Sequence, residues 1–204
     1  MTKNIFILYP SAFTCQSKFD RKLKRIISGI GHCNVLYPED PNGFIKAFFD
    51  KNTGLAKLQQ VEFTFDETNT ASHAIVFDDG SEFTEQRNYI KDNGIPLREI
   101  NINITRVVNI KREPKYSEHR STLSYEYIGR GAYWGNPHSM YEAGDDRDEV
   151  IRKYKYDFDY EKFINIDKAK VHELTGKTLG CFCKPGPCHG DVIADYLNSW
   201  DDGK

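Results

Sequence analysis

Short apolar runs alternate with amphipathic segments along the first half of the chain. Apolar side chains dominate residues 4–9, 33–38 and 73–78, and a turn-forming residue ends or follows each run. Such runs are typical of strands that are buried on both faces of a sheet. Between the first two runs, Phe19 and Leu23 belong to a set of apolar residues spaced by three and four positions, which predicts a helix.

The rest of the first half continues this alternation with two more helical and two more strand-like patterns, at residues 41–54, 81–94, 59–65 and 95–102. We expect Ser81 to cap the start of the second of these helices. Strands that alternate with helices of this length pair in parallel through crossover helices. The sequence therefore predicts an α/β fold, with a Rossmann-like parallel-sheet lobe over residues 1–104 packed on a smaller α/β lobe over residues 105–204.

The second half contains shorter patterns. Three strands are expected at residues 105–111, 125–131 and 177–183, and three helices at residues 145–163, 167–176 and 187–200. The first two strands are joined by a basic stretch, NIKREPKYSEHR, which is either a solvated loop or a nucleic-acid contact.

The composition narrows the class of protein. The chain has 39% hydrophobic and 28% charged residues and a net charge of −2, as expected for a folded protein without a general attraction to nucleic acid or anionic membranes. Neither a signal peptide nor an apolar run of membrane-spanning length is recognisable, so we expect a cytoplasmic protein without a membrane partner. Five cysteines, an odd number in a reducing compartment, argue against a disulfide framework.

Polar residues follow two strands of the predicted first lobe. Ligands of parallel α/β sheets bind beyond the carboxyl ends of the strands, where this chain has YPSAF and FDDGSEF. The candidate contacts are Ser11, Asp78, Asp79, Gly80 and Ser81. Because aspartate, glycine and serine are also common turn residues, ordinary turn chemistry is the alternative.

The stretch TLGCFCKPGPCHGDV, residues 178–192, holds three of the five cysteines. Side chains alternate along a strand, so Cys181 and Cys183 should lie on one face. Pro187 suits a first helical turn, which would place Cys188 and His189 at the start of the last helix. A helix N-terminus lowers the pKa of a thiol and also attracts anions.

Three interpretations of this stretch remain open. A zinc site would use Cys181, Cys183, Cys188 and His189, although adjacent helical residues point about 100° apart. A thiol enzyme would use Cys188, with His138 as its base. In the third interpretation the thiols are core residues, and the turn binds an anion through backbone N–H groups, Lys184 and His189.

A second motif, YIGRGAYWGNPHSM, combines groups that suit a nucleotide. Glycines at positions 129, 131 and 135 permit close approach of a ligand, and Arg130 is placed for a phosphate. Tyr133 and Trp134 offer rings for stacking, and Asn136 offers an amide for a base edge or a ribose. Arg147 is a second candidate anion contact. The alternative is a structural loop that packs Trp134 into the core.

Four motifs of residues 105–200, TRVVNIK, YIGRGAYWGNPHS, RDEVIRKY and LGCFCKPGPCHGDVIADYL, resemble in sequence and order a family called Domain of Unknown Function 4326, common in phages and bacteria. The segment HAIVFDDGSEFTEQRNYIKDNGIPLREI resembles the Rossmann-like nucleotide-binding superfamily that includes cytokinin-activating phosphoribohydrolases and the DNA-processing protein A family. These resemblances imply a protein of nucleotide or nucleic-acid metabolism, or of host–phage conflict. If it is phage-encoded, its compartment is the cytoplasm of the bacterial host.

The leading hypothesis is a nucleotide or nucleoside ligand that lies between the two halves and is cleaved or transferred at its N-glycosidic bond. The residues assigned to phosphate and sugar are Arg130, Asn136, Lys184 and His189, those assigned to stacking are Tyr133 and Trp134, and the candidate acids are Asp148, Glu149 and Asp191. The alternatives are a zinc-stabilised module that binds nucleic acid or a host protein, and a thiol enzyme that uses Cys188. Zinc is the one cofactor that the sequence suggests; the cofactor is otherwise left open, and so is the oligomeric state.

Overall fold

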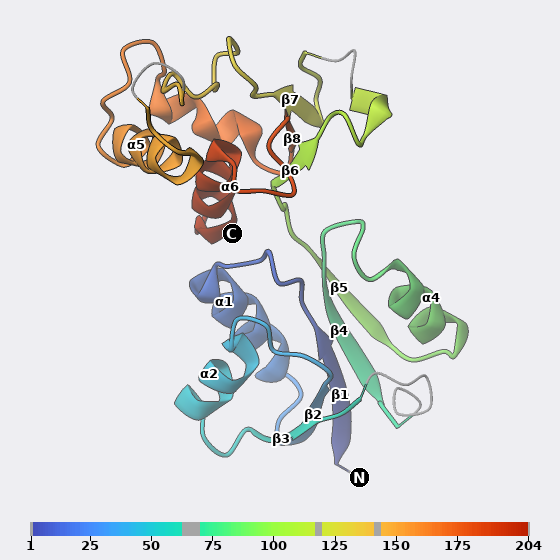
Figure 1. Ribbon diagram of the computed structural model, residues 1–204. Helices are drawn as coiled ribbons and strands as arrows, with labels where there is room; N and C mark the ends of the chain where they lie inside the picture. Colours follow the sequence, from blue (N-terminus) through green and yellow to red (C-terminus); the bar gives the residue numbers. More distant parts are fainter. Residues whose placement is uncertain (1, 63–69, 117–119, 141–143, 204) are drawn as a thin grey trace. The chain divides into compact units, whose positions relative to one another are not determined.

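The computed structural model describes residues 2–62, 70–116, 120–140 and 144–203 (Figure 1). The chain forms two compact units. One contains the residues up to Ile102 together with the segment that starts at Asp201, and the other is Asn103–Trp200. Within the described residues, no helix has the length and apolar character needed to cross a membrane.

The first unit is a parallel five-stranded sheet with helices between its strands, which confirms the predicted α/β class (Figure 1). The strand order is β3-β2-β1-β4-β5, and Ile5 of the central strand pairs with Val35 on one side and His73 on the other. The elements are β1 (Lys3–Leu8), α1 (Gln16–Ile27), β2 (Cys33–Tyr37), α2 (Phe44–Lys51), β3 (Ala56–Gln60), β4 (His73–Asp78), α4 (Thr84–Asp92) and β5 (Leu97–Asn101).

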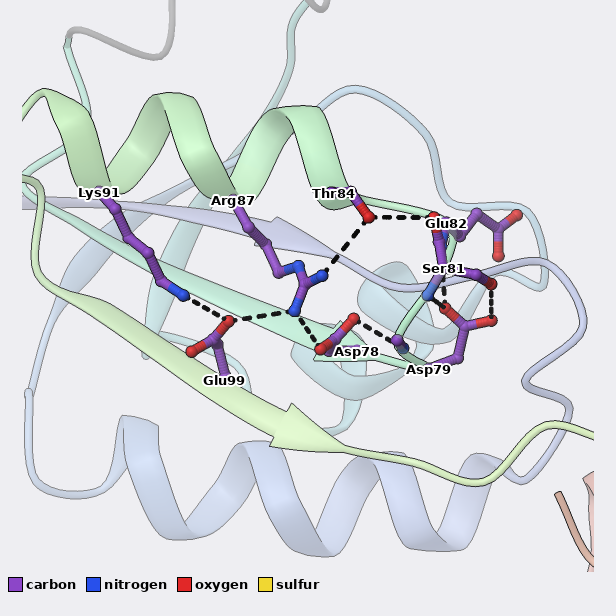
Figure 2. A network of polar contacts seen from close by, with 9 residues as sticks. Asp78, Asp79, Ser81, Glu82, Thr84, Arg87, Lys91 and Glu99 are labelled. Carbon is purple, nitrogen blue, oxygen red and sulfur yellow. Dashed lines mark hydrogen bonds and ion pairs between the residues drawn. The ribbon is translucent and has the colours of Figure 1, made fainter. Parts of the chain in front are cut away.

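Both faces of this sheet are covered, which explains the continuous apolar runs of its central strands. Figure 2 shows α4 on one side of the sheet and α1 on the other. Phe6 and Val76 pack with Ile90 of α4 on one face. On the other face the ring of Phe19, from α1, stacks on Phe77 with a centroid distance of 4.8 Å.

Two predicted boundaries are wrong. The strand expected at 59–65 starts earlier, at Ala56, where pairing with Cys33 of β2 fixes its register, and it ends at Gln60; residues 63–65 lie outside the described residues. The helix expected to be capped by Ser81 begins at Thr84. The carboxylate of Asp79 accepts hydrogen bonds from the backbone N–H groups of residues 81 and 82, which holds these residues in a turn before the helix.

The segment after residue 200 belongs to the first unit. The carboxylate of Asp201 accepts hydrogen bonds from both terminal nitrogens of Arg21, at 2.9 and 2.8 Å, and from the Ser17 hydroxyl at 2.6 Å. Lys18 forms an ion pair with Asp202 at 2.8 Å. The hydrogen bonds from Arg21 and Ser17 hold the pKa of Asp201 well below its ordinary value. Hydrogen bonds and an ion pair thus join the segment that starts at Asp201 to the first two turns of α1.

The second unit contains a three-stranded parallel sheet of order β6-β8-β7. Its elements are β6 (Arg106–Asn109), η1 (Pro114–Tyr116), β7 (Tyr125–Tyr127), α5 (Arg147–Asp159), η2 (Lys168–Leu174), β8 (Thr178–Cys181) and α6 (His189–Ser199). The helix expected at 167–176 is a 3-10 helix, and Cys188 is the N-cap of α6. Pro187 therefore precedes the helix and does not occupy its first turn.

The middle strand β8 lies very close to a buried tyrosine. A Cβ atom at Gly180 would lie 2.0 Å from the hydroxyl oxygen of Tyr125, which is 1% exposed. Tyr125 cannot move away, because its ring stacks on Tyr116 at a centroid distance of 4.6 Å. The packing of Tyr125 against β8 therefore leaves no room for a larger side chain at position 180.

We expect Gly180→Ala to destabilise the second unit by about 1–3 kcal/mol, as overpacking of a core does. Urea unfolding followed by circular dichroism measures this change. The control is Gly29→Ala, where the nearest neighbouring atom would be 3.6 Å from the new Cβ, and we expect it to be neutral. Adding Tyr125→Phe should restore part of the loss, since it removes the nearest clashing atom; full stability of Gly180→Ala alone would contradict the close approach.

Candidate functional site

A cavity of about 520 Å³ opens in the second unit between the loop at 130–139 and the segment at 162–166. Two cations, Arg130 and Lys162, and two aromatic rings, Tyr133 and Phe163, contribute to its walls. A hydrogen bond between His138 Nε2 and Asp157 Oδ2, at 2.8 Å, forms another part of the lining. The cavity therefore presents groups for an anion, for a planar ring and for proton transfer.

The loop that carries Arg130 is fixed by buried contacts. Trp134 is 4% exposed and packs into the core of the second unit, and its carbonyl oxygen accepts a hydrogen bond from the Tyr154 hydroxyl at 3.1 Å. The Asn136 amide donates to the carbonyl oxygen of Val150 at 3.0 Å and accepts from the backbone N–H of His138 at 2.9 Å. The burial of Trp134 contradicts its predicted role in stacking. Asn136 also lines the cavity, and its predicted contact with a ligand remains a prediction.

The path of the backbone explains why glycine occupies three positions of this loop. Gly131 adopts a φ of 82°, which favours glycine. A Cβ atom at Gly129 would lie 2.2 Å from the Tyr127 hydroxyl, and one at Gly135 would lie 2.6 Å from the carbonyl oxygen of Gly129. The spacing of the three glycines thus reflects a tight chain path, and direct ligand contacts at them remain a prediction.

Two of the predicted ligand residues, Arg130 and Tyr133, line the cavity together with Lys162 and Phe163. The Tyr133 side chain is 44% exposed, and its hydroxyl oxygen accepts the backbone N–H of Asp167 at 2.8 Å, which orients the ring. Sequence reasoning missed Lys162 and Phe163, which follow α5. The sequence signal for this segment is the apolar pair Phe163 and Ile164 within a polar stretch. Ile164 is 97% exposed, so it is not part of the core.

The three predicted acids lie outside this cavity and outside the smaller one beside it. Asp148 is exposed in the first turn of α5. Two hydrogen bonds of 2.7 Å from Arg152 lower the pKa of Glu149. Asp191 accepts the backbone N–H of Cys188 in the capping box of α6 and pairs with Lys184 at 2.6 Å. The last two acids thus make structural contacts, and a catalytic role for the three acids remains a prediction.

The cysteine stretch forms a compact buried cluster at the end of β8 and the start of α6. The ligand atoms of Cys181, Cys188 and His189 all lie within 4.8 Å of one another, and the sulfur atoms of Cys181 and Cys183 are 3.6 Å apart. Cys188 has extended dihedral angles as the N-cap, so its sulfur reaches to 3.8 Å from His189 Nδ1. The objection that adjacent helical residues diverge does not apply to this pair.

A reactive thiol at Cys188 is not supported by this geometry. Cys188 is 1% exposed, and its pKa is raised by contact with the other two thiols and by burial. The predicted base, His138, pairs with Asp157. Hydrogen bonds from Cys183 and Cys188 instead lower the pKa of Cys181.

The turn between β8 and α6 lacks the free cations expected of an anion site. Lys184 is paired with Asp191, and burial lowers the pKa of His189, whose Nε2 is bonded to the carbonyl oxygen of Ile128 at 2.8 Å. Arg147 lies 3.4 Å from the carbonyl oxygen of Cys183. It lines a cavity of about 220 Å³ that also contains Arg130 and the cysteines of β8 and its following turn.

In the first unit, the residues predicted at the strand ends bond to one another (Figure 2). Asp78 pairs with Arg87 of α4 and accepts the N–H of Gly80 at 2.9 Å. Asp79 accepts the Ser81 hydroxyl at 2.9 Å. The remaining candidate, Ser11, offers its carbonyl oxygen to the Asn42 amide at 2.9 Å. These contacts match the turn chemistry named as the alternative, and a ligand role for these residues remains a prediction.

Cations of the basic stretch lie over aromatic rings. Lys111 is 5.6 Å from the centroid of Phe182, and Lys115 is 4.8 Å from that of Tyr116. Arg120 lies 5.6 Å from the ring centre of Tyr127. Nucleic acid as the partner of this stretch remains a prediction.

The first unit is a Rossmann-type domain, since a parallel sheet of order 3-2-1-4-5 with helices on both faces defines that class. Residues 2–108 match the family model of the minimal SLOG domain, so the chain belongs to that family. Residues 108–199 match the model of a domain of unknown function, DUF4326. The two matches confirm the resemblances drawn from the motifs.

A curated relative is similar to part of the chain. It is an uncharacterized 12.4 kDa protein from the nrdA-td intergenic region of Enterobacteria phage T4, with 46% identity over 72 residues. The match covers 35% of this chain and 65% of the relative. No solved structure matches the chain.

We expect Arg87→Met to destabilise the first unit by roughly 3 kcal/mol, because it leaves the 8% exposed Asp78 carboxylate without its cation. Lys91→Met is the matched control. Glu99 binds both Arg87, at 3.3 Å, and Lys91, at 3.0 Å. The Lys91 side chain is 52% exposed, so Lys91→Met should lower the free energy of unfolding by less than about 1 kcal/mol. Equal effects of the two substitutions in urea unfolding would contradict the assignment of Asp78–Arg87 as the stabilising pair.

Proposed function

We propose that this protein binds a nucleotide-like ligand in the 520 Å³ cavity of its second unit. The observation that carries the proposal is the presence of Arg130, Lys162, Tyr133 and Phe163 around one cavity. Guanidinium and ammonium groups suit a phosphate, and aromatic rings suit a base. The volume lies in the range of sites that take small molecules and cofactors.

The comparisons with known proteins also support a nucleotide-related role for this protein. The first unit belongs to the minimal SLOG family and has the Rossmann-type fold, which commonly binds nucleotides. The phage T4 relative fits a role in phage nucleotide or nucleic-acid metabolism, or in host–phage conflict.

The chemical part of the proposal is cleavage or transfer at the N-glycosidic bond. Such a step breaks the bond between C1′ and the base nitrogen, and the base leaves with the electron pair. Water or an acceptor hydroxyl forms the new bond to C1′ and gives up a proton. His138 and Asp157 are the groups of the cavity suited to receive that proton and to stabilise the positive sugar.

Isothermal titration with mononucleotides, NAD and ADP-ribose tests binding. We expect Arg130→Gln to weaken binding of a phosphate-bearing ligand by about tenfold to a hundredfold, since it removes a charge-assisted contact. Arg152→Gln is the control, because Arg152 is paired with Glu149 and is not part of this cavity's lining. Absence of binding at millimolar ligand, or equal affinity in both variants, would reject the proposed site. Chromatography of ligands incubated with the protein then shows whether free base is released.

A further inference from the structure

We propose that Cys181, Cys183, Cys188 and the Nδ1 atom of His189 form a tetrahedral zinc site that holds the end of β8 to the start of α6. Thiolate and imidazole together are the ligand types preferred by zinc, and four protein ligands make a closed, structural site. This inference is independent of the nucleotide proposal, because it concerns a different group of side chains.

The distances between the ligand atoms fit one metal ion. With zinc–sulfur bonds of about 2.3 Å, two sulfur atoms of a tetrahedral site lie about 3.8 Å apart, and a sulfur and a nitrogen atom about 3.6 Å apart. The observed separations are 3.6 Å between the sulfurs of Cys181 and Cys183, and 3.8 Å between the Cys188 sulfur and His189 Nδ1. The group of Cys181, Cys188 and His189 spans no more than 4.8 Å. Cys181, Cys188 and His189 are thus close enough to share one metal ion, and the sulfur of Cys183 lies beside that of Cys181.

The orientation of the imidazole provides a second, separate argument. His189 Nε2 lies 2.8 Å from the carbonyl oxygen of Ile128, an acceptor, so Nε2 carries the ring proton and Nδ1 keeps its lone pair. Nδ1, which carries this lone pair, lies 3.8 Å from the sulfur of Cys188. A histidine that ligates zinc usually donates its other ring N–H to a carbonyl or carboxylate in this way.

The surroundings preserve this arrangement. A Cβ atom at Gly190 would lie 2.4 Å from Ile128 Cδ1, so the glycine lets the start of α6 approach Ile128 closely enough for the histidine bond. The Gly190 N–H donates to the Cys188 sulfur at 3.4 Å, a contact that stabilises a thiolate ligand. Cys181, Cys188 and His189 are all at most 5% exposed.

The role of Cys183 follows from its position. It comes two residues after Cys181 and points to the same side, and it is the least buried of the three thiols. With Cys183 as the fourth ligand, the ion closes the turn at 183–188. That turn contains Lys184, whose ion pair with Asp191 spans from the turn to the first turn of α6.

The experiment measures metal content and ligand type. Full-length protein is purified under reducing conditions without chelator or affinity metal, and native mass spectrometry counts zinc per chain. We expect about one zinc per chain. After zinc removal, Co²⁺ should give the visible bands of a tetrahedral site and strong thiolate-to-cobalt absorption in the near ultraviolet.

Two variants test the assignment. Cys183→Ser should lower the thiolate-to-cobalt absorption by about a third, because two thiolates remain of three, and should weaken zinc binding at least tenfold. Cys15→Ser, at a buried cysteine outside the cluster, should retain full zinc and the full cobalt spectrum. Wild-type protein without zinc and without a cobalt spectrum would overturn the proposal. So would a zinc content and cobalt spectrum that Cys183→Ser leaves unchanged.

Discussion

A buried contact between His189 and the carbonyl oxygen of Ile128 joins the two motifs on which the second unit depends. Ile128 is 0% exposed and lies directly before the loop that carries Arg130, and its own N–H bonds to the carbonyl oxygen of Gly180 at 2.9 Å. His189 opens α6 and belongs to the cysteine cluster. The position of the cavity wall and the position of the cluster are therefore set by the same two residues. This single hydrogen bond thus joins two motifs through residues that are 61 positions apart in the sequence.

The hydrophobic pattern predicted most of the first unit because its central strands are buried on both faces. Phe19 and Leu23 are 0% exposed, as their helical spacing requires. The pattern failed at β3, where the burial is weak and the register comes from pairing with β2, which a local pattern does not contain. It also failed at α4, where a side chain of the preceding turn determines the first helical residue.

The candidate site was less predictable than the fold. Sequence spacing identified Arg130 and Tyr133, but it gave no sign that Lys162 and Phe163 line the same cavity, since that contact depends on the course of the chain after α5. Cysteine is an unusual N-cap, so the capping box formed by Cys188 and Asp191 was not recognised. Treating Cys188 as a helical residue then produced the wrong angle between its side chain and that of His189. One misplaced helix start thus changed the apparent chemistry of the whole cluster.

The fastening of Asp201 and Asp202 to α1 has a consequence for how the molecule is made. The first unit combines the residues up to Ile102 with the segment that starts at Asp201, so synthesis must reach residue 201 before this unit has all of these contacts. During translation, the whole second unit is synthesised after Lys18 and Arg21 and before the carboxylates that bind them. A chain that stops before residue 201 would lack the carboxylates that bond to Arg21 and Lys18. The contacts of Asp201 with α1 thus link completion of the first unit to synthesis of the whole second unit.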